Sequence, residues 1–483
     1  MKIEEILLLG DADKIIEYLK KRRTSAPDTQ TNLNDWNVDK HEIMTDKEKY
    51  PDRKVLVKQE EDVWDESSKR TLHKEPEYDT EPANRIGIPL EQDIINIQTA
   101  FTVGTEPKMK CDPSNDDEKN LLKAVTSVLS KNKIKYQNKK IIRAWLAEQE
   151  VAEYWYAVDD DSFWDKFWSK VKKIFTGKTK PNKRLRSVIW SPFRGDSLYP
   201  FFDGYGDLVA VSREYKRSDL EGKEITCFQT VTKDSVYQWE SESGWKLIKE
   251  KSFKHGFEKM PILYAYRDKP YCHKIKTLRI RIEKLLSNYA DCIDYHFFPI
   301  LKLFGDVGGV SGKKKDRIVR LEGQGADAQY LTWNQVPTTI ELELNTLFNN
   351  AYSMTGTPRI SFDNLKGTGN ALSGVSFEYV FLSTHLQVEN HAEDIGDFLQ
   401  RRVNFLVSAL GTINSYEFAG ASKTIDIDVE IVPFKIENID DKVNTAVNAI
   451  SGGVWSRKQG VIFAGLTDEI EEELALIEEE AKE

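Results

Sequence analysis

The stretch that decides the fold is residues 375–410, VSFEYVFLSTHLQVENHAEDIGDFLQRRVNFLVSAL. Its apolar side chains recur at intervals of three or four positions, as on one face of an α-helix. At about 1.5 Å per residue such a helix spans ~54 Å, which is long for a globular protein. Gly396 lies in its interior, and because glycine weakens a helix, we predict a kink there. The apolar stripe comprises Phe377, Phe381, Val388, Ile395, Phe398, Leu399, Val403, Leu406 and Leu410.

A shorter helix is predicted just before this one, at residues 338–354. Thr338 is placed to cap it, and Glu341 follows three residues later, as a capping box requires. Glycine and proline at 356–358 act against the helix and end it. A loop at 355–373 then joins the two helices, and its glycines and asparagine predict a polar, flexible segment. The apolar stripe of the shorter helix is Ile340, Leu344, Leu347, Phe348 and Ala351.

A third helix is predicted at 274–298, and its first half is basic. For most of these basic residues we favour a solvated face; the alternative is contact with phosphates or with an acidic neighbouring subunit. Between this helix and the one at 338–354 lies a compact stretch, 300–337, with several glycines, a lysine run and short β-patterned segments. Because the flanking helices can pair antiparallel, we predict a small α/β module at the tip of a two-helix stalk.

The remaining segments alternate between helical and β patterns. Residues 187–266 contain short β-rich runs separated by Gly, Asp and Ser turns. Residues 159–186 contain a basic amphipathic segment whose Trp and Phe residues form one stripe. For that segment we favour packing on its own domain over lying on a membrane, since such stripes are usually core. Alternation at 424–434 predicts a strand, and Ser456 is placed to cap a late helix.

Composition excludes several classes of protein. The 483 residues include 11 Trp, 19 Tyr and 22 Phe, which indicates a folded, multidomain chain. No apolar run reaches the ~18 residues that a membrane span needs, so no membrane partner is expected. The net charge of −10 argues against a protein that coats DNA by bulk electrostatics. The four cysteines are far apart, so we expect no disulfide framework.

Catalytic motifs are missing from the sequence. No HExxH, GxSxG or CxxC occurs, and the seven histidines are scattered. Residues 308–314, GGVSGKK, fail as a P-loop, because Val307 replaces the first glycine and Lys314 replaces the hydroxyl that would bind Mg²⁺. The acids at 426, 428 and 430 alternate along a predicted strand, where an exposed face explains them better than a metal site. We therefore predict no enzymatic activity, no cofactor and no metal.

Several of these segments resemble the siphophage-type portal protein family of tailed bacteriophages. Gly356-Thr357-Pro358, a polar loop and then Ser373-Gly374-Val375-Ser376-Phe377 opening a long helix are similar to that family's tunnel loop and spine. The entry Asn84-Arg85-Ile86, with a helix ending at Gly104-Thr105-Glu106-Pro107, is similar to the start of its wing, although the ending is one residue longer. Residues 255–262 resemble the short segment before the family's stem. The acidic stretch 468–483 resembles its short crown helices and their acidic ending.

The resemblance implies an α+β, mainly helical fold with a β-rich wing, an antiparallel helical stem, a small α/β clip, a long kinked spine and a short helical crown. The resemblance covers residues 84–483, and the polar stretch before it is predicted from its composition to be an arm, so the chain divides into eight segments. They are an N-terminal peripheral arm at 1–83, wing at 84–272 with the amphipathic insertion at 159–186, stem helix at 273–299, clip at 300–337, second stem helix at 338–354, tunnel loop at 355–373, spine helix and strand at 374–434, and crown at 435–483.

The function that the resemblance implies is a ring, usually a dodecamer, at one vertex of the capsid. Double-stranded DNA would be packaged and ejected through its channel. The implied partners are the terminase large subunit, the major capsid and scaffolding proteins, and later a head-completion or adaptor protein. The implied location is the portal vertex of the virion, with assembly in the host cytoplasm.

The resemblance also implies contact residues. Asn364, Lys366 and Asn370 in the tunnel loop are the expected DNA contacts, since one lysine repeated by symmetry makes a positive ring that binds the DNA backbone without distinguishing sequence. A plain flexible loop is the alternative. The clip residues expected to contact partners or neighbours are Lys313, Lys314, Lys315, Arg317 and Trp333.

Two other classes of function are weighed against this one. The first is a membrane-associated scaffold that uses the basic amphipathic helix at 163–175, which liposome flotation would distinguish. The second is a nucleic-acid enzyme, against which the missing catalytic constellation argues. A nuclease or ATPase assay would decide that case.

Overall fold

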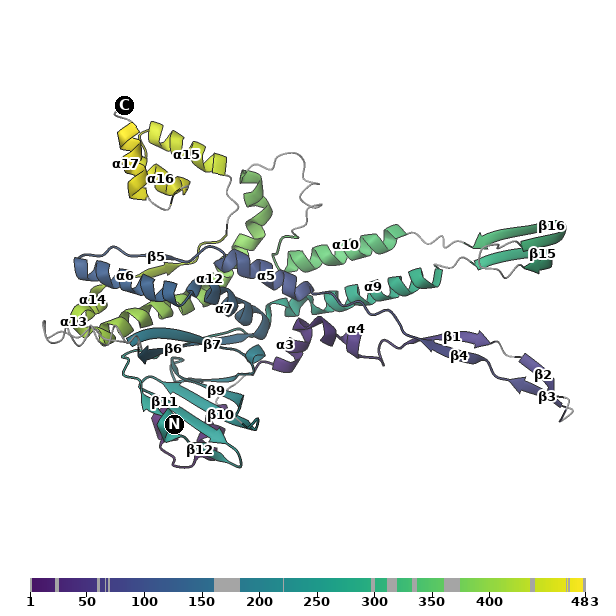
Figure 1. Ribbon diagram of the computed structural model, residues 1–483, viewed down its shortest axis with the longest axis horizontal. Helices are drawn as coiled ribbons and strands as arrows, with labels where there is room; N and C mark the ends of the chain where they lie inside the picture. Colours follow the sequence, from purple (N-terminus) through teal and green to yellow (C-terminus); the bar gives the residue numbers. More distant parts are fainter. Residues whose placement is uncertain are drawn as a thin grey trace. The chain divides into compact units, whose positions relative to one another are not determined.

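The computed structural model describes residues 2–21, 26–58, 61–65, 67, 70–159, 183–219, 221–296, 300–310, 319–331, 337–359, 374–434, 439–465, 467 and 470–480. The chain forms two compact units, each built from separated stretches of sequence. Unit 1 comprises Met1–Pro27, Ile95–Asp268 and Gly356–Glu483, and unit 2 comprises Asp28–Ile94 and Lys269–Thr355. Figure 1 labels their helices and strands.

The largest sheet of unit 1 is an antiparallel meander of six strands. Its order is β12-β11-β10-β9-β8, and β13 pairs with β11. The strands predicted within 187–266 are thereby confirmed, although most are longer than their β-rich centres. Their bounds are β8 (Ser197–Phe202), β9 (Leu208–Ser218), β10 (Glu224–Thr232), β11 (Ser235–Ser241), β12 (Trp245–Leu247) and β13 (Phe253–Lys254), with the short helix η3 at Lys249–Lys251.

Two N-terminal helices, α1 (Ile3–Leu7) and α2 (Ala12–Lys21), pack against this sheet. Ile6, Ile16 and Leu19 share one buried cluster with Phe228 and Trp239 of the sheet. The predicted arm at 1–83 is therefore not peripheral in this part. The apolar stripe of α2 needs a surface to cover it, and the sheet supplies that surface.

A second, three-stranded sheet of unit 1 has the order β14-β6-β7. Its buried aromatic residues include Trp155, whose ring centroid lies 6.4 Å from that of Phe405 on α12. The aromatic residues at 154–156 belong to its central strand. The elements in this region are α6 (Asp116–Lys131), α7 (Ile134–Glu148), β6 (Glu150–Asp159), β7 (Lys183–Trp190), η2 (Pro192–Arg194) and β14 (Ile262–Tyr266). The amphipathic segment between β6 and β7 lies at residues 160–182, outside the described residues.

Helix α12 (Gly374–Ile413) confirms the predicted long helix and has 40 residues. Its stripe is buried, with Ile395 and Leu406 at 0% exposure and Phe398 at 2%. On the same helix the Arg402 guanidinium pairs with Glu153 of β6 at 2.7 Å, and both side chains are buried. Gly396 lies inside the continuous helix, with no neighbouring atom within 4 Å of an added Cβ. The predicted kink there stays a prediction.

Shorter elements complete unit 1. Strand β17 (Asp428–Glu430) pairs with β5 (Lys108–Lys110), so the strand predicted at 424–434 is real but shorter. Its alternation holds, because Ile427 and Ile431 are buried while the acids are exposed. Ser456 caps α16 as predicted, accepting a hydrogen bond from the Gln459 N–H. The other helices are α13 (Ser415–Phe418), α14 (Ala421–Thr424), α15 (Ile439–Ser451), α16 (Arg457–Ala464) and α17 (Ile470–Glu480).

Unit 2 contains the predicted two-helix stalk. Helices α9 (Lys276–His296) and α10 (Pro337–Met354) lie side by side, and α9 is preceded by the short helix η4 (Tyr271–Ile275) (Figure 1). Between them in sequence is one antiparallel hairpin, β15 (Ile300–Val310) and β16 (Val319–Leu331). These strands are longer than predicted, because the glycines near 305 and 308 lie at two shifts of register rather than at strand ends. No helix occurs in the described part of 300–336.

The start of α10 also differs from the prediction. The helix begins at Pro337, so Thr338 is its second residue and not its cap. Proline is favoured at the first helical position, because its fixed φ suits a helix and its missing N–H is not needed there. The predicted end at Met354 is confirmed.

The N-terminal part of unit 2, which falls within the predicted arm, forms helices and strands in its described residues. Side chains of α9 hold it, and the Asn84-Arg85-Ile86 entry is part of this contact. Ser287 accepts from the Ile86 N–H at 2.9 Å, and Asp291 accepts from the Asn84 N–H at 2.9 Å. The elements are α3 (Thr29–Trp36), η1 (Val38–Lys40), α4 (Glu42–Thr45), β1 (Arg53–Lys58), β2 (Glu61–Asp65), β3 (Arg70–Lys74) and β4 (Glu77–Glu81). Helix α5 (Leu90–Val103) follows and continues into unit 1.

Candidate functional site

The root of the predicted tunnel loop is held by hydrogen bonds. In unit 1 the Gln98 amide of α5 donates to the Thr357 hydroxyl at 2.8 Å, and Thr384 of α12 donates to the Gly356 carbonyl at 2.8 Å. The four residues Gln98, Gly356, Thr357 and Thr384 are all buried. In unit 2 the Tyr271 hydroxyl donates to the Thr355 carbonyl. Residues 355–357 are therefore held in place by hydrogen bonds where the chain enters the predicted loop.

Gly356 is required at this root for two reasons. Its φ is +56°, in the left-handed region that residues with a Cβ rarely adopt. A Cβ there would also lie 2.5 Å from Cγ of Gln387 and 3.2 Å from the Ser383 carbonyl oxygen. The backbone at Gly356 thus lies too close to α12 to leave room for a side chain at this position.

The predicted DNA contacts, Asn364, Lys366 and Asn370, lie at 360–373, outside the described residues. The structure describes only the two ends of this segment, Arg359 on one side and the start of α12 on the other. The anchors Gln98 and Thr384 were missed by the sequence analysis. A signal existed for Gln98, which occupies a core-facing position of α5 between Ile94 and Phe101 and is fully buried.

The predicted clip contacts also fall outside the described residues. Lys313, Lys314, Lys315 and Arg317 belong to 311–318, and Trp333 belongs to 332–336. The described part of this module is the hairpin of β15 and β16, which follows α9 and precedes α10 in the chain. These contacts stay predictions.

Lys274, Arg281 and Lys284 are exposed, as the sequence favoured for most basic residues of this helix, and Arg279 is the exception. Arg279 is buried and pairs with Glu91, with Glu283 at 3.1 Å and with Asp35 at 2.8 Å. Burial raises the pKa of Glu91 to about 7, and the Arg279 guanidinium opposes that rise. Such a network ties α9 to α3 and α5, because a buried charge is stable only when it is paired.

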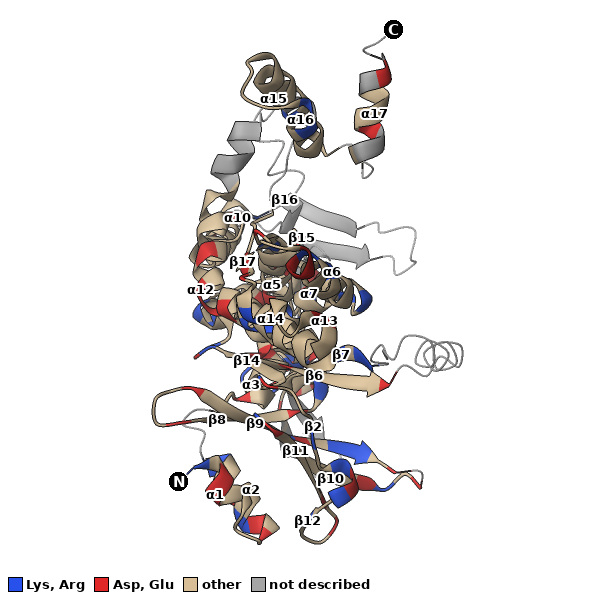
Figure 2. Ribbon diagram, turned by 90° about the vertical axis from the view of Figure 1, so that its left-hand side faces the viewer, with Lys and Arg blue, Asp and Glu red and all other residues tan. Residues whose placement is uncertain are grey.

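Two more cations of α9 have acidic partners in the same chain. Lys276 pairs with Asp35 at 2.7 Å, and Arg281 pairs with Glu343 of α10 at 2.6 Å. Figure 2 shows basic and acidic residues intermixed along the helices and strands. Paired cations have little attraction left for phosphate, so these α9 residues are poor candidates for DNA contact.

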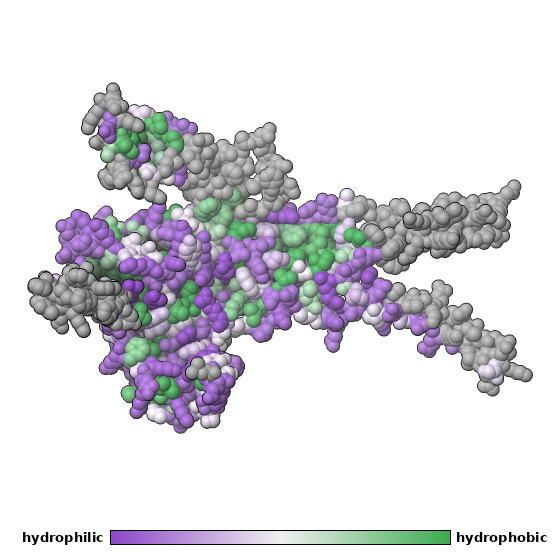
Figure 3. All heavy atoms as spheres, in the orientation of Figure 1, coloured by the Kyte–Doolittle hydropathy of each residue, from purple (hydrophilic) through white to green (hydrophobic). Residues whose placement is uncertain are grey.

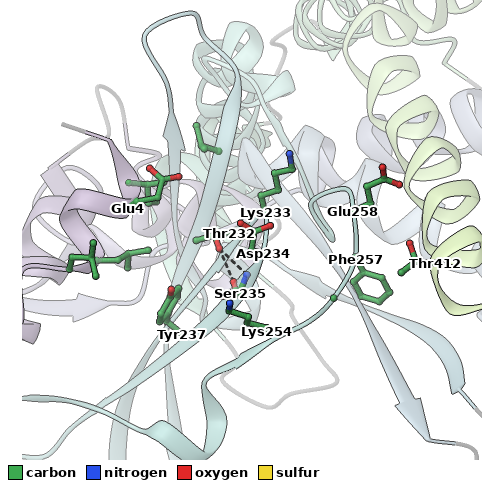
Figure 4. Close-up of a pocket in the computed structure, with 15 residues that line it drawn as sticks. Glu4, Thr232, Lys233, Asp234, Ser235, Tyr237, Lys254, Phe257, Glu258 and Thr412 are labelled. Atoms are coloured by element: carbon green, nitrogen blue, oxygen red, sulfur yellow. Dashed lines mark hydrogen bonds between the residues drawn. The ribbon is translucent and has the colours of Figure 1, made fainter.

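One cavity of unit 1 is a groove of about 740 Å³. Figure 4 shows Glu4 on one side, the turn of Lys233 and Asp234 between β10 and β11, and Phe257 and Thr412 across from it. Thr232 and Ser235 close the turn by two hydrogen bonds of 3.0 and 3.1 Å. The described residues that line the groove include no histidine or cysteine, so they assemble no nucleophile–base pair of the kind that those residues form.

Two other kinds of site, a membrane span and a metal site, are not found among the described residues. None of their helices combines the length and apolar character of a membrane span. No group of three or more His, Cys, Asp or Glu residues in the described ranges is arranged to hold a metal ion. Of the three alternating acids, Glu430 forms an ion pair with Lys110 at 2.8 Å.

Comparison with known proteins gives one family. A family model described as "Phage portal protein, SPP1 Gp6-like" matches residues 26–483. A search of curated proteins found no match. Similar solved chains come from "Neck of empty GTA particle computed with C6 symmetry" (10% identity) and "Virion of native gene transfer agent (GTA) particle" (9% identity). Each has a TM-score of 0.39 and covers 79% of this chain and 90% of the matched one. The chain belongs to the SPP1 Gp6-like family of phage portal proteins, which are structural rather than enzymatic.

Proposed function

We propose that this chain assembles into a ring, a dodecamer, at one capsid vertex and forms the channel through which double-stranded DNA is packaged and ejected. The family match over residues 26–483 carries the proposal. Terminase would dock on the ring during packaging, and head-completion proteins would replace it afterwards. A location at the head–tail junction is part of the same proposal.

An exposed apolar face on the stalk supports assembly. Leu342 of α10 is 69% exposed and Ile293 of α9 is 42% exposed, while Leu344 and Leu347 are only half-buried. Figure 3 shows an apolar area over these two helices. Contiguous apolar surface on a folded chain marks an interaction site, and in a ring the neighbouring copy would cover it.

The tunnel loop supports the proposed contact with DNA. Its root at Gly356 and Thr357 is fixed by Gln98 and Thr384, so the chain enters the predicted loop from a defined point. Lys366 would contribute one positive charge per copy, and in a ring these charges would contact phosphates of any sequence.

The experiment is Lys366→Ala, with Lys423→Ala as a control that removes one exposed lysine from α14 outside the loop. We expect rings of normal size from both variants. Particles assembled with Lys366→Ala should package less DNA, by about tenfold, because each copy loses a phosphate contact. Packaged DNA is measured after nuclease treatment. Normal packaging by Lys366→Ala, or an equal defect in Lys423→Ala, would remove the loop from the proposed function.

A further inference from the structure

A buried histidine in unit 2 joins the segment 28–50 to the stalk helix α9. His41 lies between η1 and α4 and is 2% exposed. Its Nδ1 lies 2.5 Å from Oε1 of Glu283 on α9, and its Nε2 lies 3.0 Å from the backbone carbonyl oxygen of Asp35 on α3. His41 and Glu283 are 242 positions apart in the chain, and the proposed function makes no use of their contact.

The two contacts of His41 together fix how many protons the pair holds. A carbonyl oxygen can only accept a hydrogen bond, so Nε2 of His41 carries a hydrogen. A neutral imidazole has a single N–H, and its Nδ1 would then turn a lone pair toward the carboxylate of Glu283. The contact between Nδ1 and Oε1 is therefore stable only when one more proton lies between these two atoms.

The hydrogen bonds of Glu283 place that proton on the histidine. The Ile88 N–H donates to Oε1 of Glu283, and Nη1 of Arg279 donates to Oε2, both at 3.1 Å. Hydrogen bonds to a carboxylate favour its charged form. His41 is thus an imidazolium, and its contact with Glu283 is a buried, charge-assisted hydrogen bond.

The charges around this pair are balanced. The cluster contains three cations, Lys276, Arg279 and the His41 ring, and three carboxylates, those of Asp35, Glu91 and Glu283. Arg279 pairs with all three carboxylates, and Lys276 pairs with Asp35. Because buried charges are stable only when they are paired, loss of the His41 proton would leave the cluster with one excess negative charge.

Little apolar surface holds the segment 28–50 in place. The structure describes all of these residues, and only Asn32, His41 and Ile43 among them are buried. One buried isoleucine supplies little of the apolar burial that attaches a segment of this length, so polar contacts with α9 must supply much of the attachment. The attachment is therefore sensitive to the charge of His41.

We propose that His41 and Glu283 form a proton-dependent clasp, which holds residues 28–50 on α9 while its proton is bound and releases them when the proton is lost. A solvated histidine is mostly neutral above about pH 6.5, so the closed clasp then binds one proton more than the open one. The closed form therefore loses stability as the pH rises. The proposal does not rest on the portal function.

Two other groups near the pair titrate and must be separated from it. Burial raises the pKa of Glu91 to about 7, so the stability that its protonated form gives is lost as the pH rises through 7. Burial also raises the pKa of Tyr50, whose ring centroid lies 5.9 Å from the Lys284 ammonium, above its ordinary value of 10. Tyr50 thus stays neutral up to pH 9. A variant that changes only the clasp isolates the proton of His41.

Glu283→Gln is the variant that keeps the contact and removes its dependence on a proton. The glutamine amide can donate to Nδ1 of a neutral His41, while Nε2 still donates to the Asp35 carbonyl. The cluster then holds two cations and two carboxylates, so its charges stay balanced. Glu343→Gln is the matched control, because Glu343 also pairs with a cation of α9, Arg281, but its side chain is 39% exposed.

The measurement is amide hydrogen exchange of the full-length protein between pH 6 and pH 9, expressed as protection factors. One released proton changes an opening equilibrium by about tenfold per pH unit. Protection of residues 29–45 in the unaltered protein should fall at least about tenfold more than in Glu283→Gln. Glu343→Gln should behave like the unaltered protein. The proposal is wrong if Glu283→Gln loses as much protection as the unaltered protein, or if Glu343→Gln loses as little as Glu283→Gln.

A second measurement needs no variant and decides the case if Glu283→Gln does not hold the segment at any pH. Deuterium exchange at the imidazole C2 position, read by mass spectrometry, reports whether each histidine ring is protonated. His41 should lose its proton over the same pH range in which residues 29–45 lose protection. Loss of protection while the ring keeps its proton, or loss of the proton with unchanged protection, would overturn the proposal.

Discussion

Helices α12 and α10 both carry apolar stripes at helical spacing, yet they bury them to different extents. On α12 the residues Ile395, Phe398 and Leu406 are at most 2% exposed. On α10 only Ala351 of the predicted stripe is fully buried, and Leu342 on the same helix is 69% exposed. The helices are alike in pattern, so the difference lies in what covers them.

Two sheets and neighbouring helices cover α12 within its own unit, whereas among the described residues of unit 2 α10 packs mainly along α9 and touches the short η4. Periodicity indicates which face of a helix is apolar, but not whether the same chain supplies the covering surface. Unit 1 thus closes its own core, and we infer that the stalk of unit 2 is completed by another copy.

Truncation of a core residue of α12 should have the largest effect on stability. Leu406→Ala is expected to lower the free energy of unfolding by about 2–5 kcal/mol, through lost burial and the cavity left behind. Leu386→Ala is the matched control, because Leu386 lies on the same helix but is 57% exposed. Its cost should stay within about 0.5 kcal/mol. Denaturant unfolding at a concentration where the chain is monomeric measures both, and equal costs would break the comparison.

The closed core of unit 1 should also appear as a pH dependence. Burial raises the pKa of Glu148 from 4.5 to about 7. The folded state therefore favours the protonated carboxyl, and the stability that this gives is lost as the pH rises through 7. Between pH 5 and 8 we expect a loss of about 3 kcal/mol at most from this group, at 1.36 kcal/mol per unit of pKa shift.

Glu148→Gln should remove that part of the pH dependence, because the amide oxygen can still accept from the Phe193 N–H, which is 2.7 Å from the carboxylate. The measurement is the unfolding free energy of both proteins across this pH range. Curves that stay parallel would show that water reaches Glu148 and that the core is less closed than we describe.

A third substitution sharpens the comparison at the link between the two helices. Gly356→Ala should cost about 2–3 kcal/mol, because it adds both a left-handed backbone penalty and a clash with Gln387. Gly195→Ala separates the two causes, since Gly195 has φ +88° but nothing within 4 Å of an added Cβ. Gly195→Ala should lower the free energy of unfolding by about 1–2 kcal/mol less than Gly356→Ala does, as measured by thermal or denaturant unfolding. Equal costs would mean that α12 does not approach the root of the loop closely.

The smallest effect on stability is expected on the exposed face of α10. Leu342→Ser should change the unfolding free energy of the monomer by less than about 0.5 kcal/mol, because little of its surface is buried in one chain. Hydrogen exchange of α10 in the monomer provides the check. A large loss of protection would show that Leu342 already belongs to a core.

Much of the fold could be predicted because local patterns decide it. The bounds of α12 and the end of α10 followed from periodicity, glycine and proline. The packing of α1 and α2 on the sheet could not, because a stripe does not name its partner. Nor could the long strands β15 and β16, where glycines mark register shifts that resemble turns in a sequence.

The position of the loop between α10 and α12 could be predicted, and the anchors of its root could not. Gly356 and the loop position follow from local sequence, whereas Gln98 meets Thr357 across 259 positions of the chain. Arg279 likewise pairs with Glu91 and Asp35 across 188 and 244 positions of the chain, so its burial beside an exposed basic face could not be predicted. Long-range polar pairs leave no periodic signal.

The measurement that tests the central claim most directly is the mass of the assembled particle, by mass photometry, for the unaltered chain and for Leu342→Glu. We predict a multi-copy ring for the first and mostly single chains for the second, with unchanged unfolding of the monomer. Leu247→Glu, which alters an exposed leucine of β12, should still form rings. A single chain at every concentration without any substitution, or full assembly of Leu342→Glu, would contradict the account.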